Sequence, residues 1–349
     1  MPGFGDFWGN EPVAAALAQM AETGRIPQAI LLGGVEGIGK ATLARRFAAR
    51  LLGGAERIEQ DDLSLPANTA LIEEREKWIA EKRTEAPLYF STHPDFATFA
   101  PDGPLRQISI HQMRLLKDLG QFQPMQGNRR VFLIDHMDRA NEQAANSLLK
   151  LFEEPPPYLT LIATAENVYD LLPTIRSRAI IFQMTRLSDD QMRDFARTRQ
   201  LDHAEGRIML AEGSPGQALT LNLEEYRQRR SVMLTLFECG AGVTGFGEWV
   251  RHSESFGSRK SEKLEAYAKI AYGLLEDMLL CANGEAPRKN RDLHGMIEAV
   301  ASRVNFAWIE KAASILDELV RMAARSIQKL GALDAMAISL RNEWEATCA

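Results

Sequence analysis

The sequence predicts an α/β fold, in which a parallel-sheet domain of the P-loop type is followed by an all-helical region. Two observations support this prediction. Short apolar runs alternate with helical patterns in the first half of the 349-residue chain, and the first run leads into a glycine-rich loop. From Ser188 onward every pattern is helical. Because one hydrophobic core rarely grows past about 250–300 residues, we expect two or three domains.

The apolar runs of the first half predict a doubly wound parallel sheet, because each is short and alternates with a helical pattern. Strands are expected at 29–32, 96–99, 107–110, 130–134, 159–164 and 179–182, of which 96–99 and 107–110 are the weaker candidates. Helices are expected at 12–22, 41–52, 112–120 and 141–153. The last of these helices is stopped by the prolines at 155–157.

Residues 53–92 differ from their surroundings, because they are polar and charged. We interpret them as an insertion on the α/β core, with one embedded helix at 70–83. The acidic pairs in this segment, Asp61-Asp62 and Glu73-Glu74, are interpreted as solvated surface rather than as paired catalytic acids.

The second half of the chain has the pattern of a helical bundle. Ser188 is a good N-cap for one helix, and the run Gly213-Ser-Pro-Gly216 breaks the chain before another. Two apolar stripes then repeat at spacings of three and four, which predicts bundle core and a subunit interface. They comprise Leu264, Tyr267, Ala271, Leu274, Met278 and Cys281, and Phe306, Ile309, Ala313, Leu316, Val320, Ala323, Ile327 and Leu330.

Composition indicates a globular cytoplasmic protein. The net charge is −6, so any contact with DNA would need a local basic patch. The amino-terminal residues lack the basic and apolar regions of a signal peptide, and no apolar run approaches the roughly 18 residues needed to span a bilayer. The cysteines are far apart, which predicts free thiols; they are Cys239, Cys281 and Cys348.

The glycine-rich loop matches the Walker A pattern up to its last position. In that pattern the loop amides cradle phosphates, the lysine reaches the β- and γ-phosphates, and a final Ser or Thr hydroxyl binds Mg²⁺. Here the last position is Ala41, which has no oxygen, and Thr42 would point about 100° around the helix. The expected nucleotide-loop residues are Gly34, Gly37, Gly39, Lys40 and Thr42. We therefore expect a P-loop with damaged metal binding.

The run Val131-Phe-Leu-Ile-Asp135-His136 is similar to a Walker B strand, in which an Asp helps to hold Mg²⁺ and a following Glu activates water. Asp135 is present, but His136 stands in place of the Glu. We interpret His136 as a lost base. The histidines lie at no spacing typical of a metal site, so no metal site is expected.

Two further runs resemble the AAA+ subunits of bacterial DNA polymerase III clamp loaders. Residues 146–156, Asn-Ser-Leu-Leu-Lys-Leu-Phe-Glu-Glu-Pro-Pro, are similar to the helix after Walker B in that family, and Leu172-Pro-Thr-Ile-Arg-Ser-Arg178-Ala179 is similar to its Ser-Arg-Cys segment. The resemblance implies that Arg178 is an arginine finger acting on a neighbouring subunit and that Thr164 is the sensor 1 residue. The sensor 2 arginine of the family falls on Gly216 and is absent.

The resemblance implies a RecA-like AAA+ domain at 1–185, a helical lid at 186–221 and an oligomerising collar at 222–349. It implies gamma/tau and delta subunits as partners, and the sliding clamp and primed DNA through the complex. The chain would require no cofactor, with ATP and Mg²⁺ at the adjacent subunit. The resemblance implies that the chain is not catalytic alone and that it acts as part of the DNA polymerase III holoenzyme. The four cysteines that bind zinc in many family members are missing.

Two alternatives stay open at this point. The chain could be an active AAA+ ATPase, such as a gamma/tau-like subunit or a helicase motor, although Ala41, His136 and Gly216 argue against that. It could also be a structural adaptor, against which Arg178 argues. Basic groups are interpreted as surface charge in preference to phosphate contacts; they are Arg129-Arg130, Arg227, Arg229-Arg230 and Arg259-Lys260.

Overall fold

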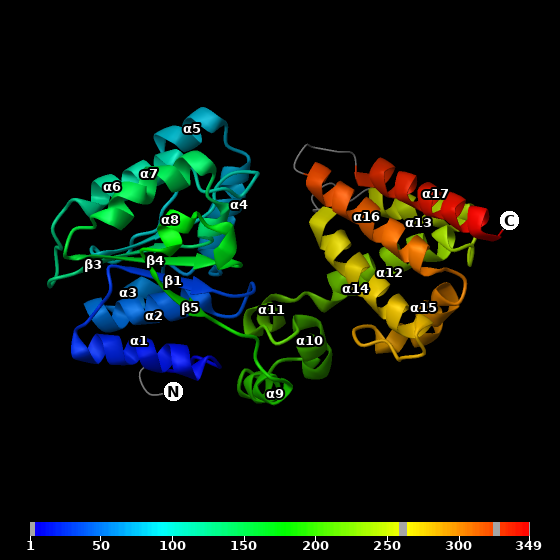
Figure 1. Ribbon diagram of the computed structural model, residues 1–349, viewed down its shortest axis with the longest axis horizontal. Coiled ribbons are helices and arrows are strands. Elements are labelled where there is room, and N and C mark those ends of the chain that lie inside the picture. The colour runs from blue at the N-terminus through cyan, green and yellow to red at the C-terminus, as the bar shows by residue number, and fades with distance from the viewer. Residues whose placement is uncertain (1–3, 258–263, 324–328, 349) are drawn as a thin grey trace. The chain divides into compact units, whose positions relative to one another are not determined.

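The computed structural model describes residues 4–257, 264–323 and 329–348. The chain divides into two compact units, residues 1–220 and residues 221–349 (Figure 1). Arg259, Lys260 and Ile327, which the sequence analysis singled out, lie outside the described residues. No helix among the described residues is long and apolar enough to cross a membrane. The finer division of the first unit, at residue 185, stays a prediction.

The first unit is built on a five-stranded sheet of order β2-β3-β4-β1-β5, in which all four strand pairs are parallel. The strands are β1 (Ala29–Gly33), β2 (Phe96–Phe99), β3 (Arg130–Ile134), β4 (Leu159–Ala165) and β5 (Ile180–Gln183). Every residue of β1 to β4 is buried, as continuous apolar runs predict. The edge strand β5 is largely exposed. The predicted α/β class is confirmed.

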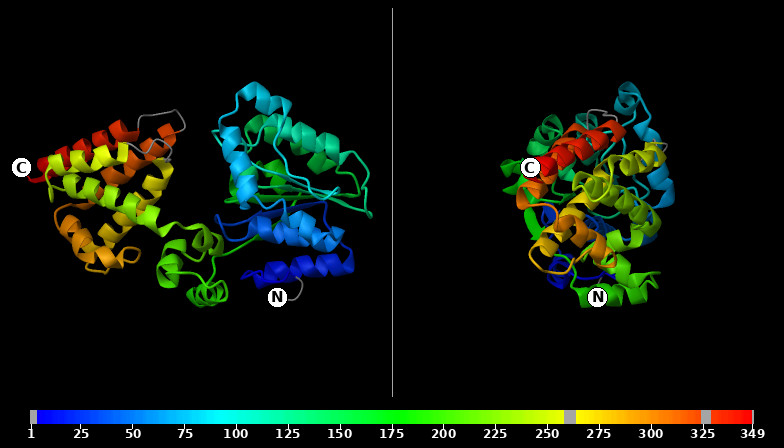
Figure 2. Two further views of the ribbon diagram at one scale, coloured as in Figure 1. Left: turned by 180° about the vertical axis from the view of Figure 1, so that it is seen from behind. Right: turned by 90° about the vertical axis from the view of Figure 1, so that its right-hand side faces the viewer.

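Helices cover both faces of this sheet (Figures 1 and 2). On one face, α1 (Glu11–Thr23) and α2 (Lys40–Leu52) share a buried core with β1, β3 and β4. On the other face, α6 (Ile110–Gly120) and α7 (Glu142–Glu153) share a second core with the same strands. Both of these later helices have side-chain caps, Ser109 on α6 and Asn141 on α7.

Two predictions for the middle of the first unit are wrong. Residues 107–110 form no strand, because Ser109 caps α6 and Ile110 is already helical. The helix expected at 70–83 is two helices, α4 (Pro66–Glu76) and α5 (Ala80–Glu85), preceded by α3 (Ala55–Glu59). This insertion is anchored to α2 by the buried side chain of Arg45, which donates to the partly exposed carboxylates of Glu59 and Asp62.

Three helices with their own apolar core close the first unit, namely α9 (Asp189–Thr198), α10 (Ala204–Ala211) and α11 (Pro215–Thr220). Ser188 caps α9 with a complete capping box, as its position predicts. Three short elements, η1 (Met137–Arg139), η2 (Val168–Asp170) and α8 (Pro173–Arg176), follow the carboxyl ends of β3 and β4.

The second unit is helical throughout its described residues. Its elements are α12 (Leu223–Gly240), α13 (Phe246–Gly257), α14 (Leu264–Ala282), η3 (Arg291–Leu293), α15 (His294–Ala301), α16 (Phe306–Ala323) and α17 (Lys329–Cys348). They enclose one large core that includes Trp249 and Trp308. The first predicted stripe lies in α14. The second does not belong to one helix, because Ala323 ends α16 and Leu330 is in α17, and its first residue, Phe306, is 66% exposed.

Candidate functional site

The glycine-rich loop that matches the Walker A pattern lies between β1 and α2. The side chain of its lysine donates hydrogen bonds to the loop itself. Lys40 is 5% exposed, and its Nζ donates to the carbonyl oxygens of Gly34 (2.5 Å) and Val35 (2.9 Å). Burial lowers the pKa of this amine, and nearby carboxylates, first that of Asp135, oppose the shift. The donors that a P-loop lysine offers to phosphates are therefore directed at backbone carbonyls in this structure.

The helix α11 packs directly on the same loop. The amide of Gly216 donates to the carbonyl oxygen of Gly37 (2.8 Å), and Ser214 Oγ donates to the carbonyl oxygen of Glu36 (2.8 Å). A Cβ atom on Gly216 would lie 2.7 Å from that Gly37 oxygen, which is closer than any side chain tolerates. Gly37 has φ +76°, and a Cβ there would lie 2.5 Å from Ser214 Oγ.

This contact gives a physical reason for the missing arginine at position 216. Any residue other than glycine would push α11 away from the loop, so an arginine could be present only in a more open arrangement. Ala41 and Thr42 are both half-buried on the first turn of α2. The hydroxyl that the Walker A pattern places directly after Lys40 is missing, because Ala41 occupies that position. The nearest hydroxyl is that of Thr42, one residue later on α2.

The carboxyl ends of β3 and β4 hold the second half of the site. Thr164 Oγ1 donates to Asp135 Oδ1 (2.5 Å) and accepts from the amide of His136 (2.8 Å). Asp135 is 7% exposed, and Thr164 is fully buried. The predicted Walker B aspartate and sensor 1 threonine are thus bonded directly to each other, because β3 and β4 are parallel neighbours.

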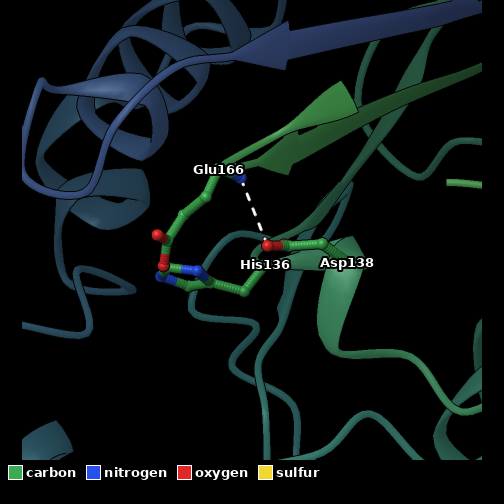
Figure 3. Close-up of side chains that lie close together, drawn as sticks. All are labelled: His136, Asp138 and Glu166. Atoms are coloured by element: carbon green, nitrogen blue, oxygen red, sulfur yellow. Dashed lines mark hydrogen bonds between the residues drawn. The ribbon is translucent and has the colours of Figure 1, made fainter. Parts of the chain in front are cut away.

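Sequence analysis missed two carboxylates beside His136. Asp138 in η1 and Glu166 after β4 lie near the imidazole, and one ligand atom from each of the three residues lies within 4.8 Å of the others (Figure 3). The amide of Glu166 donates to Asp138 Oδ2 (3.3 Å). Their separation in sequence hides this cluster; only the pairing of β3 with β4 brings position 166 beside positions 136 and 138.

Arg178 lies between α8 and β5, where its side chain contacts Glu153 and Thr174 of the same chain. Its side chain is 35% exposed and forms an ion pair with Glu153 at the end of α7 (Nη2 to Oε1, 2.9 Å). Nη1 donates to the carbonyl oxygen of Thr174 (2.8 Å). Exposed apolar side chains occur in the same segment, with Tyr169 75%, Ile180 45% and Ile181 41% exposed. Glu153 is a third carboxylate that the sequence analysis missed.

Two of the basic groups are neither surface charge nor available for phosphate. Arg130 is buried and pairs with Asp95 (3.2 Å), and Arg230 is buried and pairs with Asp292 (2.5 Å). Their interpretation as surface charge is wrong, because each guanidinium completes a buried polar contact. Arg229 pairs with Glu225 one helical turn earlier (2.8 Å).

Comparison with known proteins relates the chain to replication proteins. A family model described as "DNA polymerase III, delta subunit" matches residues 9–188. DNA polymerase III subunit gamma of Buchnera aphidicola (Acyrthosiphon pisum strain) is 28% identical over 193 residues, which are 55% of this chain and 48% of that protein. Subunit tau of Escherichia coli K12 is 26% identical over 66% of this chain and 32% of that protein.

Subunit delta' of Pseudomonas aeruginosa is 31% identical over 166 residues, or 48% of this chain and 45% of that protein. The chain therefore spans about half, or less, of the length of these curated relatives. Among solved structures, a DNA polymerase III gamma subunit-related protein from Thermotoga maritima aligns with a TM-score of 0.46 at 18% identity. The alignment covers 94% of this chain and 99% of that protein.

Proposed function

The chain belongs to the DNA polymerase III delta-subunit family of clamp-loader AAA+ proteins, and within that family we propose that it is a delta-prime-type subunit. In this proposal it hydrolyses no ATP. It assembles with gamma/tau and delta subunits into a machine that loads the sliding clamp onto primed DNA, and it supplies Arg178 to the ATP site of a neighbouring gamma/tau subunit.

The contact of Gly216 with Gly37 is the observation that carries this proposal. It leaves no room for a γ-phosphate-sensing arginine at position 216. In the same site, Lys40 is bonded to loop carbonyls and position 136 has no carboxylate. Phosphoryl transfer depends on positioned cations, a metal ion and an oriented water. A site without the sensor arginine, the metal hydroxyl and the general base is poorly suited to hydrolysis.

The surroundings of Arg178 support a role in trans. An arginine finger must reach a neighbour's phosphates, so it must be accessible, and this side chain is about one-third exposed. Ile180 and Ile181 on the edge strand β5 are exposed apolar residues that a neighbouring subunit would cover.

An active gamma/tau-like ATPase is the second candidate, because several of the curated relatives are gamma or tau subunits. Steady-state ATP turnover of the isolated chain separates the two candidates. We expect no turnover above background, because loss of a general base alone costs about 10²–10⁴ in rate. Turnover near ~1 s⁻¹, the low end for phosphoryl-transfer enzymes, that Lys40→Ala abolishes would support the active ATPase instead.

Reconstitution with gamma/tau and delta subunits from the same bacterium tests the finger. Arg178→Ala should leave the assembly intact but lower turnover at the one abutting site by about 10³–10⁵. Arg178→Lys should restore little, because an ammonium lacks the planar fork of a guanidinium. Arg197→Ala removes another exposed arginine, on α9, and serves as the matched control. Normal ATPase in an intact Arg178→Ala complex would leave the subunit as an adaptor only.

A further inference from the structure

We propose that His136, Asp138 and Glu166 form a binding site for a single divalent cation of the zinc class, distinct from a magnesium site at the P-loop. The three residues come from the ends of two neighbouring parallel strands, His136 and Asp138 after β3 and Glu166 after β4. Each offers one ligand atom, and these atoms lie within 4.8 Å of one another (Figure 3). The inference does not depend on the proposed function.

Two of the ligand groups carry buried atoms without partners. Among the described residues, His136 Nδ1 and Asp138 Oδ1 are both shielded from solvent and accept or donate no hydrogen bond. A buried polar atom without a partner costs about 1–3 kcal/mol, so native proteins rarely leave one unsatisfied. A cation bound through these two atoms would give each of them the partner that it lacks.

The backbone holds the imidazole in place. His136 has φ 55° and ψ 56°, a left-handed conformation that costs a non-glycine residue energy. Its amide bonds to Thr164 Oγ1 at 2.8 Å, which fixes this turn against β4. The amide of Glu166 bonds to Asp138 Oδ2 at 3.3 Å, so two of the three ligands are also connected to each other.

The donor set selects the class of cation. Imidazole nitrogen favours Zn²⁺ and its neighbours among the transition metals, whereas Mg²⁺ and Ca²⁺ prefer oxygen ligands alone. One imidazole and two carboxylates provide three protein ligands and leave a position for water. Tetrahedral ligands at 2.0–2.2 Å from zinc lie about 3.4 Å apart, so a pair separated by the full 4.8 Å must close by about 1.4 Å. The Glu166 side chain is 41% exposed, so it can make that movement once it leaves its ion pair with Arg139.

Two cations compete with a metal ion at this position. Arg139 Nη2 lies 3.6 Å from Glu166 Oε1, and Lys40 is close enough for the charges of Asp138 and Glu166 to act on its amine. Lys40 is bonded to loop carbonyls and offers no ligand. Arg139 occupies a carboxylate that the metal needs, so its removal should strengthen metal binding several-fold.

The test uses the untagged full-length chain after EDTA treatment and dialysis. Zn²⁺ titration by calorimetry should show one equivalent bound, and Co²⁺ should give the visible absorption of a four-coordinate nitrogen and oxygen site. His136→Asn, Asp138→Asn and Glu166→Gln should each weaken Zn²⁺ binding by at least tenfold. Arg139→Gln should strengthen it, and Mg²⁺ in large excess should not displace Zn²⁺.

His203→Asn is the matched control, because His203 also has a left-handed backbone (φ 49°) and lies outside the cluster. Asparagine tolerates this conformation, so both histidine variants should fold, and circular dichroism checks that they do. Absence of Zn²⁺ binding would overturn the proposal. So would binding that His136→Asn leaves unchanged, which would indicate an adventitious site on the thiols or another histidine, and so would Mg²⁺ binding as tight as that of Zn²⁺.

Discussion

Because α11 packs closely on the Walker A-like loop, we predict that Gly216→Ala destabilises the first unit. Gly216 has the backbone of the surrounding helix, so alanine would ordinarily be preferred there by about 0.5–1 kcal/mol. In this structure the added methyl group would lie 2.7 Å from the carbonyl oxygen of Gly37 and 3.0 Å from its Cα. Because both atoms are backbone, no side chain can rotate away, and α11 must move instead.

The size of the effect follows from three contributions. Overpacking of this kind costs about 1–3 kcal/mol. Displacement also breaks the 2.8 Å hydrogen bond from the Gly216 amide to Gly37, which adds about 0.5–1.5 kcal/mol. After the gain in helix propensity, a net loss of about 0.5–4 kcal/mol is expected. For a unit of this size each kcal/mol lowers Tm by about 2–4 °C.

Gly206→Ala provides the control, because Gly206 is in the neighbouring helix α10 and a Cβ there meets no atom within 4 Å. That variant should be more stable than the wild type by about 0.5–1 kcal/mol. The measurement is scanning calorimetry of both full-length variants, with hydrogen exchange of residues 34–42. Gly216→Ala should also raise exchange in the loop. Equal stability and equal loop protection in the two variants would refute the close packing of α11 on the loop.

Three further predictions concern single side chains. Asp277→Ala should destabilise the second unit by about 3–4 kcal/mol in urea denaturation, because its buried carboxylate accepts from the amides of residues 288–290; a loss below about 1 kcal/mol would contradict this. Burial raises the pKa of Tyr226 to about 12, so the part of the free energy of unfolding that this residue contributes is present below about pH 10 and should decline towards pH 12. Tyr226→Phe should flatten that decline in alkaline unfolding followed by absorbance. Glu153→Gln removes the carboxylate partner of Arg178; because the pair is half-exposed, stability should change by less than about 1 kcal/mol, and ATPase of the reconstituted complex should rise, whereas a fall to the level of Arg178→Ala would make Glu153 a necessary positioning partner.

The sequence could predict the sheet because its strands are unambiguous. Residues 130–134 were predicted without error, and residues 29–33 with an error of one, since continuous apolar runs between polar turns have few other uses. The strand predicted at 107–110 was wrong although a contrary signal was present. Ser109 and Gln112 form a capping box, a local pattern that outweighs weak apolar alternation.

The site could be predicted only in part. Lys40, Asp135 and Thr164 belong to motifs whose residues are close in sequence or on neighbouring strands, and the structure brings Asp135 and Thr164 into direct contact. The backbone contact between Gly216 and Gly37 could not be predicted, because the two residues are 179 positions apart in the sequence and only the fold brings them together. Glu166 was missed for a similar reason, since its relation to His136 exists only through the pairing of β3 with β4.

The departures from an active site at positions 41, 136 and 216 are physically connected. With α11 on the loop, no arginine fits at 216, so nothing on this helix would sense a γ-phosphate. Without a positioned γ-phosphate, a glutamate at 136 would have no attacking water to orient and a hydroxyl at 41 would have no bridging metal to bind. Each group depends for its use on the others, and an arginine that acts on a neighbour depends on none of them. In the proposed role, Arg178 acts on a neighbouring subunit, so its use does not depend on an open loop in this chain. The exposure of Arg178 and its ion pair with Glu153 are therefore the features on which the proposed role is most directly testable.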